Sequence, residues 1–371
     1  MYIKRVCLKD FRNYELQELD LSAGTNILLG ENAQGKTNAL EAMYLLAVGK
    51  SHRTNHDLDL VRFNQPVAQV DANLVVHGRE QAVSVRIGST GKRATVNGVA
   101  QSKMTQFVGR FQVVLFAPED LALVKGAPGL RRRFLDVELA QTQSAYLHHL
   151  SRYSKILAQR NSFLKRDLLD EALLDTLDEQ LVQSGVEVIV RRLRFLHKLR
   201  GFAADTYKAV SDGRERLRID YVSNVAEAQI SENPDPMRLN ESFYKTLVAK
   251  RASDRHHGFT SIGPHRDDLL FHLDDKPVHG FASQGQQRSI ALALRLAEID
   301  FIHDEVGEFP VLLLDDVLSE LDDVRQTGLV LSMSDKVQTV ITTTSLYHLE
   351  RQLKADGNLF EVQSGIIQRR G

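Results

Sequence analysis

The strongest constraint on the fold is an eight-residue segment near the N-terminus: Gly30, Glu31, Asn32, Ala33, Gln34, Gly35, Lys36 and Thr37. The apolar run before it, residues 26–29, is typical of a short strand, and from Lys36 onward apolar residues recur at helical spacing. G-x-x-x-x-G-K-T between a strand and a helix is the pattern of a phosphate loop. Its glycines let backbone N–H groups turn around a phosphate, and the helix N-terminus adds partial positive charge. The segment favours a nucleotide-binding α/β fold over an ordinary glycine-rich turn.

A phosphate loop needs a carboxylate to complete a metal site, and a second motif supplies one. Residues 309–322 read FPVLLLDDVLSELD, in which an apolar run typical of a central parallel strand ends in Asp315 and Asp316. Open α/β folds bind their ligands at this carboxyl edge. We expect Lys36 to reach the phosphates of ATP, Thr37 and Asp315 to hold Mg²⁺, and Asp316 to polarise the attacking water. The alternative is a solvated acidic turn.

The distance between the two motifs indicates a large insertion. More than 270 residues separate Lys36 from Asp315, and directly upstream of the acidic strand stand Ser283, Gln284, Gly285 and Gln286, before an apolar helix. This order, completed by Leu-Ser-Glu-Leu-Asp at 318–322, is that of the ABC-type ATPases. Ser283 has a simpler interpretation as a helix N-cap, whose hydroxyl accepts a hydrogen bond from the backbone.

The middle of the chain changes character twice. Residues 67–116 alternate apolar and polar side chains between turn sequences, which predicts a β meander. From Pro118 onward, apolar residues follow two long helical faces that we expect to pack as an antiparallel arm. The predicted fold class is α/β: a P-loop ABC-ATPase head with a β meander and an inserted helical arm domain. The predicted boundaries are 1–117 and 258–371 for the head and 118–257 for the arm.

Charge and composition narrow the choice of partners. The formal net charge of the 371 residues is −1, so a nucleic-acid surface must be a local patch. A basic strip in the predicted arm is one candidate: Arg131, Arg132, Arg133, Arg191, Arg192, Arg194, Lys198 and Arg200. A solvated helix face explains the same residues equally well.

Other features exclude further classes of site. Cys7 is the only cysteine, which excludes a disulfide framework and a cysteine-based zinc site. The histidine pairs at 148–149 and 256–257 lack partners at ligand spacing, so we interpret them as surface residues. The charged N-terminus and the lack of a long apolar run predict a soluble cytoplasmic protein without a membrane partner.

Together these segments resemble the RecF family, bacterial recombination mediators that are head-only relatives of the SMC-type ABC ATPases. The resemblance covers the whole length. The sequences that carry it are LKDFRNY (8–14), GENAQGKTNALEAMYLL (30–46), GKSHRT (49–54), FAPEDLALVKGAPGLRRRFLD (116–136), SIGPHRDDL (261–269), SQGQQR (283–288) and LLLDDVLSELD (312–322).

The resemblance implies roles for individual residues. Arg12 would approach the phosphates beside the loop, and Ser283 to Gln286 would form a signature that closes over ATP held by a second subunit. Asp316 stands where most ABC ATPases have glutamate, and VITTT (340–344) has threonine where transporters have a switch histidine. These departures predict slow hydrolysis.

The resemblance also implies a function. We expect a weak, DNA-stimulated ATPase whose ATP-dependent homodimer clamps DNA at single-strand gaps, junctions and stalled forks. RecR would be the direct partner and RecO an indirect one in loading RecA, which supports SOS induction. Two alternatives are an ABC transporter ATPase subunit and a scaffold that binds ATP without hydrolysing it.

Overall fold

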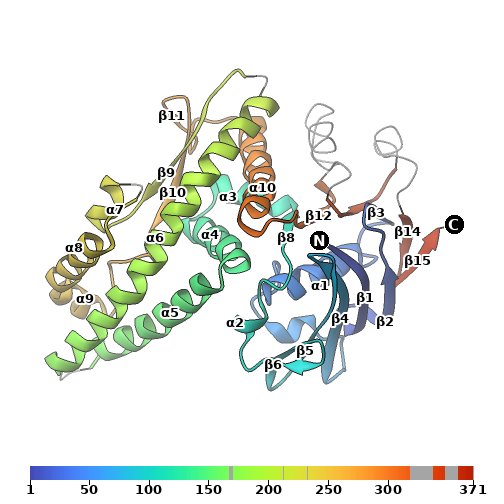
Figure 1. The fold of residues 1–371 in the computed structure, drawn as a ribbon, viewed down its shortest axis with the longest axis horizontal. Coiled ribbons are helices and arrows are strands. Elements are labelled where there is room, and N and C mark those ends of the chain that lie inside the picture. The colour runs from blue at the N-terminus through green and yellow to red at the C-terminus, as the bar shows by residue number, and fades with distance from the viewer. Residues whose placement is uncertain (167–169, 212, 232, 318–336, 347–357, 371) are drawn as a thin grey trace. The chain divides into compact units, whose positions relative to one another are not determined.

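The computed structural model describes the chain except residues 167–169, 212, 232, 318–336, 347–357 and 371 (Figure 1). It separates into two compact units, one of residues 1–120 with 291–371 and one of residues 121–290. Residues 258–290, which the sequence interpretation assigns to the head, lie in the second unit because the strand at 268–273 pairs with the strand at 217–222.

The first unit contains an antiparallel sheet in the order β2-β1-β4-β5-β6-β7. Its strands are β1 (Tyr2–Phe11), β2 (Tyr14–Asp20), β4 (Val67–Val76), β5 (Arg79–Gly88), β6 (Gly91–Val96) and β7 (Val99–Ala100). Burial alternates along β4 and β5, as the sequence pattern predicts for strands with one face on the core. The β meander predicted for residues 67–116 is confirmed over 67–100, whereas residues 104–107 form a short helix and 113–116 form a strand of the other sheet.

The second sheet of this unit has the order β15-β14-β3-β13-β12-β8 and is parallel except for its β14–β15 hairpin. Its strands are β3 (Thr25–Leu29), β8 (Val113–Phe116), β12 (Val311–Asp315), β13 (Thr339–Thr343), β14 (Asn358–Gln363) and β15 (Ile366–Arg370). Every residue of β12 and β13 is buried, as expected for central parallel strands covered on both faces. The carboxyl ends of β3, β12 and β13 therefore meet at one edge.

Helix α1 (Lys36–Val48) contacts strands of both sheets. Residues 39–48 of this helix are all buried, which explains why, apart from Glu41, they are apolar on every side of the helix. The other helical elements of the unit are η1 (Asp57–Leu60), α2 (Met104–Phe107), η2 (Pro118–Asp120) and residues 291–306 of α10 (Gln284–Val306). Because α1 is enclosed along its length, its N-terminus has a fixed position at the end of β3.

The second unit is mainly helical. Its helices are α3 (Leu121–Lys125), α4 (Pro128–Thr142), α5 (Ser144–Leu164), α6 (Glu171–Val210), α7 (Ala226–Ile230), α8 (Pro236–Ala249) and α9 (Arg251–His257). Two long helices of the predicted arm, α5 and α6, pack against each other. The first predicted helical face, residues 135–157, is divided between α4 and α5, because Gln143 has an extended backbone. A Cβ at Gly185 in α6 would lie 2.6 Å from the Phe243 ring and 3.0 Å from the Tyr153 ring, so glycine permits this close packing.

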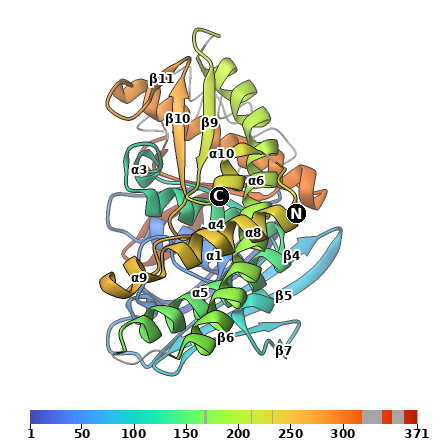
Figure 2. The same cartoon turned by 90° about the vertical axis from the view of Figure 1, so that its left-hand side faces the viewer.

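A three-stranded sheet in the order β11-β10-β9 completes the second unit. Its strands are β9 (Leu217–Val222), β10 (Asp268–Leu273) and β11 (Lys276–Pro277), and β9 and β10 run side by side in Figure 2. Among the residues that the structure describes, no helix is long and apolar enough to cross a membrane.

Candidate functional site

The phosphate loop, residues 30–37, joins β3 to α1 and is closed on one side by the turn between β1 and β2. Tyr14 Oη donates to the carbonyl of Gly35 (2.8 Å), and Asn13 Nδ2 donates to the carbonyl of Gln34 (3.1 Å). Gly35 has a φ of +118°, and a Cβ there would lie 2.7 Å from Asn13 Nδ2. Glycine is therefore required at this position both for the backbone conformation and for space.

Ala33 departs from this pattern of glycines. Its φ is +63°, in the left-handed region. A residue with a Cβ occupies this region at a cost of about 1–2 kcal/mol. The strain lies in the middle of the loop.

Lys36 begins α1, and its ammonium lies within the loop. Its Nζ donates to the carbonyls of Gly30 (2.6 Å) and Glu31 (2.7 Å). Burial lowers the pKa of Lys36, and the charges of Asp316 and Asp315 oppose that shift. The side chain is thus placed as a phosphate ligand requires, with backbone carbonyls as its partners in this structure.

Asp315 ends β12 and is held by side chains from two other elements. Its Oδ1 accepts from Thr37 Oγ1 (2.9 Å) at the start of α1 and from Thr342 Oγ1 (2.8 Å) on β13. Residues 278 positions apart in the chain, Thr37 and Asp315, therefore meet as the sequence predicts. Since a hydroxyl and a carboxylate are hard oxygen ligands, this pair has the chemistry that suits Mg²⁺.

Asp316 follows in a strained backbone conformation, with a φ of +51°. Its N–H donates to Thr342 Oγ1 (3.0 Å), so the Thr342 hydroxyl contacts both aspartates. Burial raises the pKa of Asp316; the charge of Lys36 counteracts this shift and that of Asp315 adds to it. A raised pKa makes this carboxylate more basic than an exposed one, which suits a group that accepts a proton from water.

Arg12 is held beside α1 by Glu41, which is fully buried. Arg12 Nε and Nη2 each lie 2.8 Å from the Glu41 carboxylate, and Nη1 donates to the carbonyl of Asp59 (2.8 Å). Glu41 also accepts from Ser51 Oγ and lies 3.6 Å from Arg53 Nη1. Burial acts to raise the pKa of Glu41, but the hydrogen bonds from Arg12 and Ser51 outweigh it and hold the pKa below its ordinary value. The carboxylate is therefore charged and orients Arg12.

The sequence interpretation missed Glu41, Ser51 and His52. The available signal was that Glu41, one turn after Thr37, is the one acidic residue of α1 and lies in its apolar part. His52 packs edge-on against Tyr44 (5.3 Å between ring centroids), and burial lowers its pKa to about 4. It is therefore neutral at neutral pH.

The predicted signature begins α10 and lies in the second unit. Ser283 N donates to Gln286 Oε1 (2.7 Å), and Gln286 N donates to Ser283 Oγ (3.2 Å), which together form a capping box. Gln286 Nε2 also donates to Glu215, whose other oxygen accepts from Tyr207 Oη (2.8 Å). The simpler interpretation of Ser283 as an N-cap is thus observed, and it leaves the hydroxyl proton of Ser283 available for another acceptor. The predicted Leu-Ser-Glu-Leu-Asp segment at 318–322 lies outside the described residues.

The basic strip requires a correction. Arg131 and Arg192 are buried, the first paired with Asp268 (2.6 Å) and the second with Asp136 (2.7 Å), so neither is a surface group. Helix α6 is covered on several sides, and Arg192 lies on a covered face.

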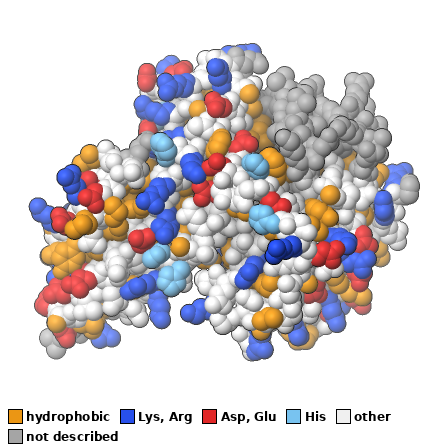
Figure 3. Space-filling model, viewed as in Figure 1, with side chains coloured by type: hydrophobic (Ala, Val, Ile, Leu, Met, Phe, Trp, Pro, Cys, Tyr) orange, Lys and Arg blue, Asp and Glu red, His pale blue; other side chains and the backbone are white. Residues whose placement is uncertain are grey.

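Other members of the strip differ in their surroundings. Arg200 donates to the carbonyl of Ile219 (2.6 Å), and Arg132 donates to that of Asp267 (2.8 Å). Arg191 lies 2.8 Å from Glu187. The exposed members are Arg133, Arg194 and Lys198. Basic and acidic side chains are interspersed over the face seen in Figure 3, so no broad basic surface appears there.

The fold and the site define the class: an α/β P-loop head of the ABC-ATPase type with an inserted helical arm. The chain belongs to the RecF/RecN/SMC family, whose N-terminal domain model matches residues 2–368.

Similar proteins agree with this assignment over the full length. The DNA replication and repair protein RecF of Listeria monocytogenes serotype 4b is 45% identical over 373 residues and covers 100% of both chains. The RecF of Geobacillus thermodenitrificans is 45% identical over 371 residues, 99% of both chains.

Solved structures are similar as well. The recombination mediator protein RecF with ATP, in the RecFOR pathway, is 32% identical, with a TM-score of 0.92 over 100% of this chain and 98% of that one. The Smc head domain of Pyrococcus furiosus shares the fold, with 16% identity and a TM-score of 0.55 over 100% of this chain and 96% of that one.

Proposed function

We propose that this protein is an ATP-dependent DNA-binding protein of recombinational repair and replication restart, in which ATP joins two heads around DNA. The observation that carries the proposal is the convergence of Lys36, Thr37 and Asp315 at one sheet edge. The similarity to a RecF solved with ATP supports the choice of nucleotide. The relatives named for DNA replication and repair support the choice of DNA.

The residues present fit a magnesium ion. Thr37 Oγ1 and Asp315 Oδ1 already lie 2.9 Å apart, and both are oxygen ligands. Thr37 and Asp315 would be the protein's ligands beside those of the nucleotide. When bound, Mg²⁺ would neutralise developing charge on the phosphate oxygens.

The side chains of the site then have distinct tasks. Lys36 exchanges the carbonyls of Gly30 and Glu31 for phosphate oxygens, which replaces neutral acceptors with charged ones. Asp316 accepts a proton from the attacking water. Arg12, oriented by Glu41, is a second cation for the phosphates.

The signature acts across the dimer interface in this proposal. Ser283 Oγ accepts from Gln286 N within its own chain and so keeps its proton for the γ-phosphate held by the other subunit. Turnover is slow, on the order of one per second or less. Hydrolysis then opens the dimer and releases DNA, and RecR is the partner with which the clamp loads RecA.

Sedimentation with and without ATP and gapped DNA tests the proposal. We expect a monomer without nucleotide and a DNA-bound dimer with ATP. Lys36→Met should prevent the dimer, and Lys36→Arg should bind nucleotide weakly without turnover, because a planar guanidinium cannot occupy the compact position of the ammonium.

The same experiments separate the alternatives. Normal steady-state hydrolysis by Lys36→Arg would remove the phosphate loop from the mechanism. Absence of hydrolysis in a single-turnover assay would leave an ATP-binding scaffold. Stimulation by a membrane partner rather than by DNA would favour a transporter subunit.

A further inference from the structure

We propose that the second unit carries a separate nucleic-acid site, which binds single-stranded segments by stacking their bases on the surface around α9. This surface, here called the arm platform, consists of six exposed residues: Lys165, Arg166, His256, His257, Phe259 and Arg266. None of them belongs to the basic strip predicted from the sequence. Binding at this site requires neither ATP nor a dimer, so its test is independent of the ATP-dependent DNA clamp proposed above.

The first observation is a row of planar side chains. The guanidinium carbon of Arg266 lies 4.9 Å from the centroid of the Phe259 ring, and the His257 ring lies 5.6 Å from the same ring. His256 lies edge-on to His257, with 5.0 Å between the two ring centroids. Phe259 is 40% exposed, which is uncommon for so large an apolar ring. Bases stack both on aromatic rings and on guanidinium planes, so the row offers several surfaces of the right kind.

The second observation is positive charge beside the row. A Cβ at Gly258 would lie 3.3 Å from Lys165 Cγ, so the Lys165 stem packs directly on the loop that carries Phe259. The next residue, Arg166, lies with its guanidinium carbon 5.3 Å from the centroid of the Phe163 ring. Cations at the edge of a stacking surface are what a phosphate backbone requires.

Among the described residues, three carboxylates beside the loop are engaged with other arginines. Asp178 and Asp254 are fully buried and pair with Arg160. Asp175 pairs with Arg251 at 2.5 Å, and Asp178 contacts the same guanidinium at 2.7 Å. The cations of the arm platform are thus separate from these internal ion pairs.

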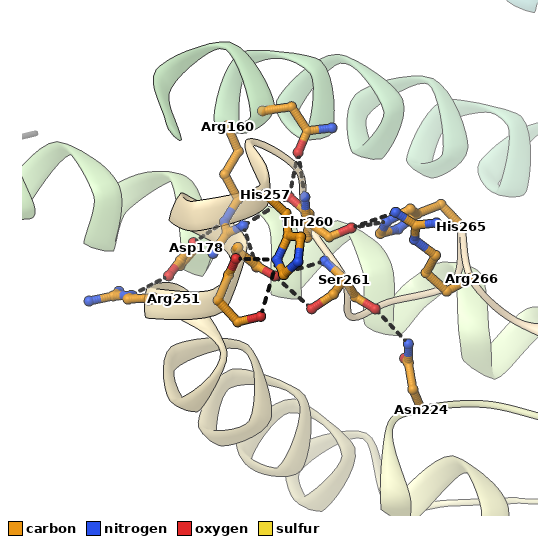
Figure 4. A network of polar contacts seen from close by, with 12 residues as sticks. Arg160, Asp178, Asn224, Arg251, His257, Thr260, Ser261, His265 and Arg266 are labelled. Atoms are coloured by element: carbon orange, nitrogen blue, oxygen red, sulfur yellow. Dashed lines mark hydrogen bonds and ion pairs between the residues drawn. The ribbon is translucent and has the colours of Figure 1, made fainter. Parts of the chain in front are cut away.

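The third observation is a network of hydrogen bonds and ion pairs that holds the loop that carries Phe259 (Figure 4). Arg160, fully buried on α5, donates to Asp178 (2.6 Å), Asp254 (2.8 Å) and Thr260 Oγ1 (2.9 Å). Asp254 in turn accepts from the backbone N–H (3.1 Å) and hydroxyl (2.6 Å) of Ser261. Such a network holds the backbone on both sides of Thr260 in one conformation.

The same loop is linked to the planar row. The carbonyl of Thr260 accepts from Arg266 Nη2 (3.3 Å) and from His265 Nε2 (3.0 Å). His257 Nδ1 donates to the carbonyl of Ser253 (2.8 Å), which orients that ring. Side chains that are already fixed by hydrogen bonds in the unbound protein lose little conformational entropy when a ligand binds.

Nucleic acid suits this surface better than an acidic protein segment does. Cations alone would fit either polyanion. The planar row adds a property that only bases use fully, because every base has a face that stacks and does so without sequence preference. The arm platform is therefore expected to bind single strands of any sequence, weakly and with strong dependence on salt.

The test measures binding of a fluorescent oligothymidylate of about 20 nucleotides to the full chain without ATP, with an abasic oligomer of the same length in parallel. We expect Phe259→Ala to weaken oligothymidylate binding about tenfold and to leave the abasic oligomer unaffected. Arg266→Lys should also weaken it while keeping the salt dependence, because the charge remains and the plane is lost. Lys165→Ala should reduce the slope of log affinity against log salt by about 0.7.

Two matched controls separate the site from general surface effects. Phe63→Ala removes a ring that is 87% exposed in the first unit, and Arg238→Ala removes an exposed arginine of the second unit, to which the arm platform belongs. Both should leave binding unchanged, and circular dichroism should show that all variants are folded. Equal losses for Phe259→Ala and Phe63→Ala would overturn the proposal. An equal loss of affinity for the two oligomers in Phe259→Ala would also overturn it. So would binding of polyglutamate by the wild-type protein as tight as that of oligothymidylate.

Discussion

Ser283 offers the sharpest test of the site, because its two interpretations predict effects of different size. In the structure its hydroxyl accepts one hydrogen bond, from Gln286 N at 3.2 Å. Ser283→Ala removes that bond and should lower the free energy of unfolding by about 1 kcal/mol. For a unit of this size, that is a decrease in Tm of about 2–4 °C. If Ser283 is only an N-cap, Ser283→Ala should hydrolyse ATP at the wild-type rate at temperatures well below the Tm.

The signature predicts a further loss. A hydroxyl that donates to a charged phosphate in the transition state contributes about 1.5–3 kcal/mol. Turnover in Ser283→Ala should therefore fall about 10- to 100-fold. Ser283→Arg should fold and bind ATP at its own phosphate loop but fail to dimerise.

A matched control removes an N-cap from a helix that is not part of the predicted signature. Asp235 caps α8 by accepting from Met237 N (2.9 Å), so Asp235→Ala should lose about the same stability and keep full turnover. Steady-state hydrolysis and thermal melting of the three variants give the comparison. Mixing Ser283→Arg with Lys36→Met should restore ATP-dependent heterodimers, because both changes can lie in one composite site. Normal dimerisation and turnover of Ser283→Arg would refute the signature and leave only the cap.

Three further predictions concern other parts of the chain. Asp316→Asn should trap an ATP-bound dimer that holds DNA longer, seen by sedimentation and DNA dissociation; a dimer no more stable than that of wild type would exclude Asp316 as the water-activating group. Ala33→Gly should raise the free energy of unfolding by about 0.5–1 kcal/mol because it relieves the strain of a φ of +63°, whereas Ala33→Val should lower it, as thermal melting can show. Burial lowers the pKa of His265 from 6.5 to about 4, so its contribution to stability is present above pH 6.5 and is lost as pH falls toward 4. From about pH 7.5 to about pH 5 this loss is about 2 kcal/mol, and urea unfolding of His265→Gln should depend less on pH than wild type or the exposed-histidine control His197→Gln.

Patterns of neighbouring residues in this sequence were sufficient to predict the local structures. The segment at 30–37 predicts its own strand–loop–helix geometry, because its glycines and the apolar runs beside it act within a few residues. The same holds for the β meander and the two long helices of the arm. The meeting of Thr37 with Asp315 was also predictable, since parallel strands bring their carboxyl ends to one edge.

Tertiary structure alone decided the partners of the polar side chains. Thr342 contacts Asp315 because β13 lies beside β12, and Arg12 pairs with Glu41 because the turn after β1 packs on α1. Arg131 and Arg192 look like surface cations in the sequence but are buried in ion pairs. Periodicity shows that a helix has an apolar face but not what covers its other faces, and the role of a charged side chain depends on that packing.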